Sequence, residues 1–464
     1  MTKDLGAPLE QEYLHVPSFI LECGAELRDV PVAYKTWGTL NGARDNVMVI
    51  CHAFTGSADI IDWWGPLMGV GKAFDPRRWF IFCGNVLGSP YGTASPVTIN
   101  SDTGMNYGPD FPPTSIRDDV KLHKLVLDHL GVSAIGVVIG GSMGGMAVLE
   151  WPLCTPPGYV KRIIPLATSA KHSAWCISWG EAQRQSIYAD IEYRDGYYKD
   201  QPATGLAAAR MTALLTYRSR DSFETRFGRK VQVKNECLLN GGGRDEGAHK
   251  TVFSQSSGIP LVAAKDDAWV VHNDGNRKCR SNLSTEPSST PYTFSAQSYL
   301  RYQGDKFTAR FDANCYIHIS HKLDTHDISR DRRMVYPDGN VEPDAAATAR
   351  ILSILPPRAL IISISTDGLF TPSEQQELAA HIPDAELVTV QSPDGHDGFL
   401  LEFEQINAHV LGFLEREFPA LYATNVGLDA DVSQTQNFVV KKTSIFGEAE
   451  ADGALVMWTV IAAS

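Results

Sequence analysis

The sequence is short of positive charge: its 464 residues contain 41 lysines and arginines against 54 aspartates and glutamates, a net charge of −13. Proteins that bind nucleic acid usually carry a basic face, so this balance argues against such a partner. The chain has no run of 18 apolar residues, so we expect no membrane-spanning helix. Its first thirteen residues lack a basic segment followed by an apolar one, so we expect no secretory signal.

Paired cysteines are also missing. The eight cysteines are scattered without a C-x-x-C pair, and several, such as Cys51 and Cys83, lie in apolar runs. This usage favours reduced, structural cysteines and a cytoplasmic protein. We expect no metal site and no permanently bound cofactor. The chain is too long for one small domain, so a large core with an insertion, or two domains, is expected.

The most informative stretch runs from residue 135 to 151, I-G-V-V-I-G-G-S-M-G-G-M-A-V-L-E-W. An apolar, β-branched run over 135–139 meets glycines surrounding one serine, and a helix-competent segment follows. The pattern G-x-S-x-G, at Gly140, Ser142 and Gly144, places a serine on a sharp strand-to-helix turn in many hydrolases. A glycine-rich turn that merely joins a strand to a helix is the alternative. The strand before and the helix after favour a nucleophilic serine, provided that an acid and a histidine follow.

The rest of the chain alternates between strand and helix patterns at both ends. Residues 17–36 alternate weakly and give an edge strand that ends at Gly38, and further strands are expected at 47–51, 78–83, 135–139, 160–167, 359–365 and 385–390. Helices are expected from an N-cap at Ser115 to Gly131 and over 371–381 and 399–418. This alternation predicts an α/β fold whose mostly parallel sheet has helices on both faces.

The middle of the chain breaks this alternation. Helix patterns dominate residues 168–348, at 179–188, 205–217 and 299–321, and a polar stretch near 235–295 has no clear period. We therefore expect a discontinuous core, 1–167 and 349–420, with an inserted helical cap at 168–348 that contains a mobile segment near 235–295. The tail, 421–464, is compatible with an extra strand pair or with disorder.

Two later residues are candidate partners of Ser142. Asp367 follows the strand expected at 359–365, and His396 lies in a glycine-containing loop after the next strand. A carboxylate can fix the tautomer of an imidazole that acts as the base for a serine hydroxyl. A turn aspartate and a surface-loop histidine are the alternatives for each residue alone. The order Ser, Asp, His is the one found in hydrolases with this kind of turn.

The oxyanion that a nucleophilic serine creates needs hydrogen-bond donors. The backbone N–H of Met143, directly after the serine, is one candidate. The other donor usually comes from the loop after an earlier strand, and the segment following 47–51 makes the Phe54 N–H our choice.

Several motifs together resemble a known family. They are C-H-A-F-T-G, N-V-L-G-S-P-Y-G, S-I-R-D-D-V, G-G-S-M-G-G-M, A-R-M-T-A-L-L-T-Y-R-S, F-D-A-N-C-Y, S-T-D-G-L-F and G-H-D-G-F. This string is similar to homoserine O-acetyltransferases of the α/β-hydrolase superfamily, above all to fungal members. The resemblance covers roughly residues 17–420, and the stretch near 235–295 and the tail depart from the shortest members.

The resemblance implies a reaction. An acetyl group would pass from acetyl-CoA, a co-substrate, to the hydroxyl of L-homoserine through an acetyl-serine at Ser142, on the route to methionine. It further implies that Arg210 binds the substrate carboxylate, that Tyr217 lies on the same helix face, and that Asp397 binds the ammonium group. It also implies a homodimer with cap helices at the contact. A solvated arginine, a core tyrosine and a helix N-cap are the respective alternatives for these three residues.

Three other functions remain open at this stage. One is a serine esterase of the same fold. Another is a related O-acetyltransferase that acts on L-serine or deacetylcephalosporin C, against which Gly141 argues weakly. The third is a catalytically inactive binding protein, which a complete Ser142, Asp367 and His396 set argues against.

Overall fold

The computed structural model describes residues 10–232 and 293–423. Of these, residues 10–223 and 300–423 belong to one compact unit and residues 224–232 and 293–299 to a second. In the second unit, β7 (Val231–Gln232) and β8 (Thr293–Phe294) form an antiparallel pair. Most of the stretch expected to be mobile, near 235–295, lies outside the described residues, as does the tail from residue 424 onward.

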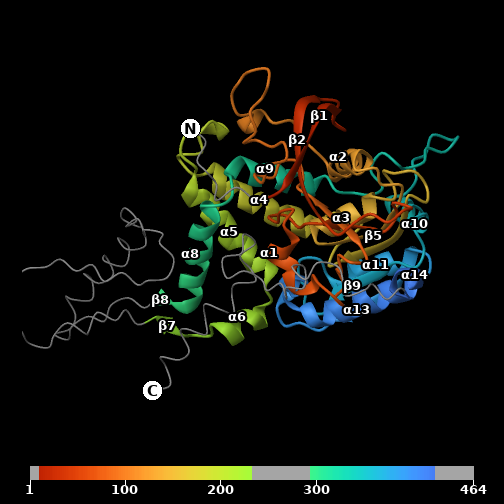
Figure 1. Cartoon of the computed structure of the whole chain (residues 1–464). Coiled ribbons are helices and arrows are strands. Elements are labelled where there is room, and N and C mark those ends of the chain that lie inside the picture. Colours follow the sequence, from red (N-terminus) through yellow and green to blue (C-terminus); the bar gives the residue numbers. More distant parts are fainter. Residues whose placement is uncertain (1–9, 233–292, 424–464) are drawn as a thin grey trace, which may run out of the picture. The chain divides into compact units, whose positions relative to one another are not determined.

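An eight-stranded sheet organises the first unit, in the order β1-β2-β4-β3-β5-β6-β9-β10 (Figure 1). The strands from β4 to β10 run parallel, whereas β1 and β2 pair antiparallel with their neighbours. The strands are β1 (Glu12–Ile20), β2 (Glu26–Trp37), β3 (Val47–Cys51), β4 (Phe80–Gly84), β5 (Ile135–Gly141), β6 (Val160–Leu166), β9 (Leu360–Ile364) and β10 (Glu386–Val390). The predicted mostly parallel sheet is therefore confirmed.

Helices cover both faces of this sheet because the central strands bury apolar residues on both sides. Val138 belongs to a core cluster with residues of the helices α2, α3, α10 and α11, whereas Val137 and Ile139 belong to a cluster with residues of α1 and α13. The covering helices are α1 (Ile60–Trp64), α2 (Ile116–His129), α3 (Met143–Glu150), α10 (Asp344–Ser353), α11 (Pro372–His381), α12 (Gly398–Leu401), α13 (Phe403–Glu417) and α14 (Pro419–Ala423). Ser115 caps α2 as predicted, since its Oγ accepts a hydrogen bond from the Asp118 N–H.

The strand expected to end at Gly38 is present as β2, but the prediction that it is an edge strand is wrong. The structure has a hairpin there: β1 is the outermost strand, and β2 pairs with both β1 and β4. Gly24, with φ of 86°, lies in the turn between them. The sequence pattern hid β1 because only Val16 and Phe19 of that strand are buried, so its alternation is weak.

Two predicted long helices are each split in the structure. The helix expected over 299–321 is α8 (Ser295–Thr308) followed by α9 (Ala313–Asp324), because Asp312 leaves the helical conformation and caps α9 through the Cys315 N–H. The helix expected over 399–418 is α12 and α13, separated at Glu402, whose ψ is 54°. An apolar period continues across such breaks, so periodicity alone does not reveal them.

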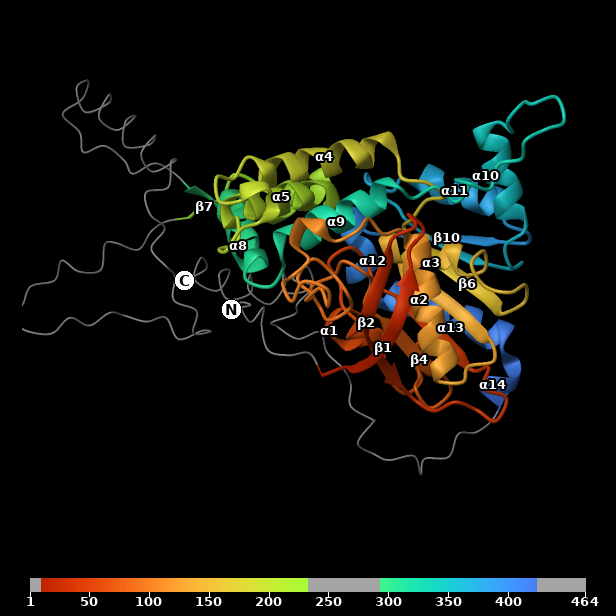
Figure 2. The same cartoon turned by 90° about the horizontal axis from the view of Figure 1, so that it is seen from above.

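The helices between β6 and β9 include α4 (Ala174–Tyr188), α5 (Ala203–Tyr217) and α6 (Arg220–Arg226), besides α8 and α9. The helices α4, α5 and α9 lie together in both views (Figures 1 and 2). The chain leaves the sheet near residues 169–172 and returns near 326–328, and these segments pair antiparallel. The His172 N–H donates to the His326 carbonyl at 2.9 Å, and the Ile328 N–H donates to the Ala170 carbonyl at 3.0 Å.

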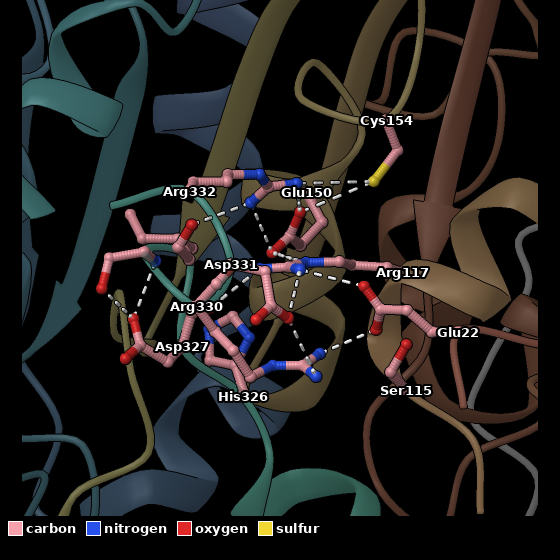
Figure 3. A network of polar contacts seen from close by, with 12 residues as sticks. Glu22, Ser115, Arg117, Glu150, Cys154, His326, Asp327, Arg330, Asp331 and Arg332 are labelled. Atoms are coloured by element: carbon pink, nitrogen blue, oxygen red, sulfur yellow. Dashed lines mark hydrogen bonds and ion pairs between the residues drawn. The ribbon is translucent and has the colours of Figure 1, made fainter. Parts of the chain in front are cut away.

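A buried polar network joins the segment that returns to the sheet to helices α2 and α3 (Figure 3). Glu150, at the end of α3 and only 1% exposed, accepts hydrogen bonds from the Arg117 Nε at 3.1 Å and from Arg332 at 3.0 and 2.7 Å. Arg117 also donates to Glu22 and to the carbonyls of Asp327 and Arg330. Glu150 therefore ties α2 and the returning segment to the helix that follows Ser142.

The turn between β5 and α3 depends on close backbone packing. A Cβ on Gly144 would overlap the carbonyl of Cys51, and one on Gly140 would lie 2.7 Å from the Gly144 backbone and 2.8 Å from the Cys51 carbonyl oxygen. Because backbone atoms cannot give way as a flexible side chain can, these two positions require glycine.

No helix in the described ranges is both long and apolar enough to span a bilayer.

We predict that Glu150→Ala destabilises the fold, because it leaves two arginines without their shared carboxylate in a buried site. Removing one partner of a buried ion pair costs about 3–5 kcal/mol, so the denaturant midpoint should fall clearly. Glu26→Ala, which removes an exposed partner of Arg28, is the control and should not change the midpoint measurably. Equal midpoints for the two variants would contradict this role of Glu150.

We also predict that Gly144→Ala prevents correct folding of the β5–α3 turn, as judged by soluble yield and thermal midpoint. The matched control is Gly412→Ala in α13, where an added Cβ meets nothing within 4 Å. That control should be neutral or stabilising, by up to about 1 kcal/mol, because alanine is the better helix former. A Gly144→Ala protein as stable as the control would show that the turn tolerates a side chain.

Candidate active site

Ser142 lies at the turn between β5 and α3 in a conformation that non-glycine residues rarely adopt, with φ of 58° and ψ of −125°. Such a conformation costs on the order of 1–3 kcal/mol and persists only where the surroundings enforce it. The Ser142 N–H donates to the Leu166 carbonyl at 3.1 Å, and Thr168 Oγ1 donates to the Ser142 carbonyl at 2.8 Å. Both ends of the residue are thus fixed to β6 and the segment after it.

His396 and Asp367 form a buried pair, each 3% exposed. The His396 Nδ1–H donates to Asp367 Oδ2 at 2.7 Å. The other carboxylate oxygen, Oδ1, accepts from the N–H groups of Leu369 at 2.8 Å and Phe370 at 2.9 Å. The backbone therefore holds the carboxylate still, and the carboxylate leaves Nε2 as the ring nitrogen available to other groups.

The His396 ring lies among aromatic side chains. The rings of Phe399, Phe370 and Tyr217 have centroids 5.0, 5.2 and 6.2 Å from it. Gly395, with φ of 67°, packs against the backbone of Tyr217, since a Cβ there would lie 2.8 Å from the Tyr217 carbonyl oxygen. The imidazole is therefore restricted in the orientations that it can take.

One pocket brings most of the predicted site residues together. Ser142, His396, Phe54, Tyr217 and Asp397 all line it. Asp367 lies behind His396, as its hydrogen bond requires. The Met143 side chain is buried in the core, and Met143 is the first residue of α3, where helix N–H groups are without intrahelical partners.

Arg210 lies farther from the pocket than the sequence suggests. It is 1% exposed, and its guanidinium carbon is 4.8 Å from the Phe307 ring centroid and 5.7 Å from that of Tyr217. Of these residues, Tyr217 lines the pocket as the described residues define it, and Arg210 does not. Arg210 is therefore beside the pocket, next to the Tyr217 ring.

Asp397 has a partner that sequence reasoning missed. Its Oδ2 lies 2.7 Å from the Nε of Arg218, and the Nη1 of Arg218 bonds Asp394 at the same distance. Burial raises the pKa of the Asp397 carboxyl, and the Arg218 guanidinium opposes that rise. Asp397 lies at the N-cap position of α12 but makes no capping hydrogen bond there, which disfavours its reading as a helix cap. Arg218 directly follows Tyr217 in the motif T-Y-R-S, which was the available signal.

Helices α4 and α9 supply a further wall of the pocket that the sequence did not indicate. Its residues include Trp179, Gln183, Ser320 and Asp324. Among the described residues, no group of three or more histidine, cysteine, aspartate or glutamate side chains is placed to hold a metal ion.

Comparisons with known proteins place the chain among relatives of known family. The sequence profile of a family described as alpha/beta hydrolase fold matches residues 46–403. A homoserine O-acetyltransferase of Cryptococcus neoformans var. grubii is 52% identical, over 97% of this chain and 97% of its own length. The homoserine O-acetyltransferase of Saccharomyces cerevisiae is 48% identical, over 95% and 93%.

Solved structures with lower identity show the same fold. The homoserine O-acetyltransferase of Bacillus anthracis is 20% identical and superposes with a TM-score of 0.68, covering 88% of this chain and 98% of its own. Esterase E22 is 24% identical with a TM-score of 0.66, covering 88% and 100%. An esterase and an acetyltransferase are thus about equally similar in structure, so the fold alone does not separate the two activities.

The sequence relatives do separate them, because they match at about half of all positions across nearly the whole chain. The predicted fold and family are both confirmed: the chain has the α/β-hydrolase fold and belongs to the homoserine O-acetyltransferase family.

Proposed function

We propose that this protein transfers an acetyl group from acetyl-CoA to the hydroxyl of L-homoserine, with Ser142 as the nucleophile. The observation that carries the proposal is the 2.7 Å hydrogen bond between His396 and Asp367, in a pocket that Ser142 also lines. Acetyl-CoA is a co-substrate that leaves after each transfer. The product of such a reaction serves methionine biosynthesis.

The first half-reaction acylates the enzyme. His396 Nε2 takes the proton of the Ser142 hydroxyl as its oxygen attacks the thioester carbonyl. The N–H groups of Met143 and Phe54 donate to the oxyanion that forms. The carbon–sulfur bond then breaks, and the CoA sulfur leaves with the proton from His396, which gives acetyl-Ser142 and free CoA. Asp367 keeps the imidazole in the correct tautomer and stabilises its positive charge.

The second half-reaction repeats the chemistry with an alcohol. His396 takes the proton of the homoserine hydroxyl, whose oxygen attacks the acetyl carbonyl of acetyl-Ser142. The Ser142 oxygen leaves and recovers a proton from His396. The free serine and O-acetylhomoserine are the products, so every proton and acyl group is accounted for.

Recognition of the amino acid acceptor is assigned to three residues. Asp397 pairs with the ammonium group, and Arg218, at 2.7 Å, orients that carboxylate and opposes the rise in its pKa that burial causes. Arg210 attracts the substrate carboxylate from beside Tyr217, at whose ring it lies. A guanidinium can bind a carboxylate through two parallel hydrogen bonds, which fixes position as well as charge.

Acyl transfer to an alcohol requires that water be kept from acetyl-Ser142. We assign this task to the helices of the first unit that lie between residues 168 and 348, which we propose as a cap on a core of residues 1–167 and 349–420. Support comes from the pocket lining, in which residues of α4, α5 and α9 face Ser142 and His396. An enclosed pocket excludes competing hydrolysis.

We extend the proposal to a homodimer in the cytoplasm. The helices α4 and α5 carry the exposed apolar side chains of Trp175, Ile177 and Leu215. Exposed apolar residues on neighbouring helices are typical of subunit contacts, which supports a homodimer through these helices. The six described cysteines are free, as they would be in the cytoplasm.

We predict that Ser142→Ala stops the release of CoA from acetyl-CoA, because the variant lacks the hydroxyl that we propose as the acetyl acceptor. The rate, measured by thiol detection with and without homoserine, should fall by at least about 10⁴-fold. Release of CoA at the wild-type rate would refute the mechanism.

We further predict a preference for homoserine over serine as the acceptor. The side chain of serine is one methylene shorter, and one methylene changes transition-state binding by about 1–3 kcal/mol, or 10- to 200-fold. Comparison of kcat/KM for the two amino acids, with deacetylcephalosporin C as a third acceptor, measures this. Comparable values for serine, or a preference for deacetylcephalosporin C, would favour the related acetyltransferases instead.

A further inference from the structure

The mechanism uses one side of the pocket and leaves the wall formed by α4 and α9 unexplained. Tyr217 and Asp397, on the side assigned to the amino acid acceptor, come from α5 and from the turn that carries His396. The rest of the lining includes Gln183 from α4 and Asp324 from α9.

Gln183 is a fixed and almost fully buried amide. It is 6% exposed, and its Oε1 accepts a hydrogen bond from the Tyr316 hydroxyl at 2.8 Å. Burial holds the pKa of the Tyr316 phenol far above its usual range, so this hydroxyl stays a donor. The Tyr316 ring packs against Phe54, with centroids 4.7 Å apart, which fixes the amide close to the proposed oxyanion site.

Tyr316 bonds the oxygen of the Gln183 side-chain amide and does not contact its nitrogen as a partner. That nitrogen makes no hydrogen bond within the described part of the protein, and it is not among the buried atoms that lack a partner. It must therefore keep accessible surface, and the pocket that Gln183 lines supplies that surface. The wall thus offers a hydrogen-bond donor to a molecule in the pocket.

Asp324 lies on the same wall, where it is paired with Arg184. Its Oδ2 lies 2.7 Å from the Nη2 of Arg184, and its Oδ1 is a buried atom without a hydrogen-bond partner within the described ranges. Gly180 lies beside it, since a Cβ on that glycine would be 3.5 Å from Oδ1. The apolar side chains of Trp179, Leu323 and Leu369 complete this part of the pocket.

A neutral donor among apolar side chains suits a ligand in which amides alternate with methylenes. The pantetheine arm of a thioester donor has this chemistry, with carbonyls that accept and N–H groups that donate. We propose that the α4–α9 wall binds this arm, with Gln183 donating to one of its amide carbonyls. The proposal rests on the proposed function and adds the residues that select the acyl donor.

The test compares acyl donors that differ in their amides. Gln183→Met keeps the length of the side chain and removes the donor. We expect kcat/KM for acetyl-CoA, and for the N-acetylcysteamine thioester with its single amide, to fall about 5- to 20-fold, the loss of one buried hydrogen bond. The rate of acylation by p-nitrophenyl acetate, which has no amide, should stay at the wild-type value.

Two further variants sharpen this comparison. Gln185→Met on the same helix is the matched control, because Gln185 is exposed and bonds only Glu181 among the described residues. It should leave all three donors unaffected. Tyr316→Phe keeps the aromatic packing but frees the Gln183 amide, so it should weaken acetyl-CoA and again spare p-nitrophenyl acetate.

Three results would overturn the proposal. They are an unchanged kcat/KM for acetyl-CoA in Gln183→Met, an equal loss with p-nitrophenyl acetate, and an effect confined to the KM for homoserine. The last would place Gln183 at the acceptor instead of the donor. Failure of the wild-type protein to use acetyl-CoA at all would instead refute the proposed function, so the two failures can be told apart.

Discussion

The conformation of Ser142 is the constraint on which the rest of the site depends. A residue with φ of 58° needs neighbours that hold it, and here backbone groups at the end of β3 and in α3 approach so closely that Gly140 and Gly144 cannot carry side chains. On the other side of β5, the Ser142 N–H bonds the Leu166 carbonyl of β6. The parallel sheet around the turn holds Ser142 in this conformation, which an isolated strand and helix could not do.

Two carboxylates of the site, Asp367 behind His396 and Asp397 in the pocket lining, have different surroundings. Asp367 receives two backbone N–H groups and one imidazole, so its contacts are directed at His396. Asp397, thirty residues on, pairs with the guanidinium of Arg218 instead. Two neighbouring acids can therefore serve different partners, one oriented toward a base and the other toward an external cation.

Much of this could be read from the sequence because the signals are local. Strand and helix periods gave the parallel sheet, and glycines around Ser142, with Asp367 and His396 after successive strands, gave the residues that meet in the pocket. The first hairpin and the break at Asp312 were missed because exposed strands and continued apolar periods carry little contrast. Arg218, Tyr316 and Gln183 were missed for another reason: their importance comes from contacts between distant segments, such as the one between Tyr316 and Gln183, 133 residues apart.

The paired crossings at residues 169–172 and 326–328 have a consequence for how the protein loses its activity on heating. Antiparallel backbone bonds join the two crossings, and Glu150 ties the returning one to the far end of α3. The helices that line the pocket are thereby coupled to the helix that begins after Ser142. Regions with few buried contacts are the ones that open locally. Because the pocket helices are joined to α3 by buried contacts, we expect pocket and sheet to melt in one cooperative transition, without an earlier loss of the pocket alone.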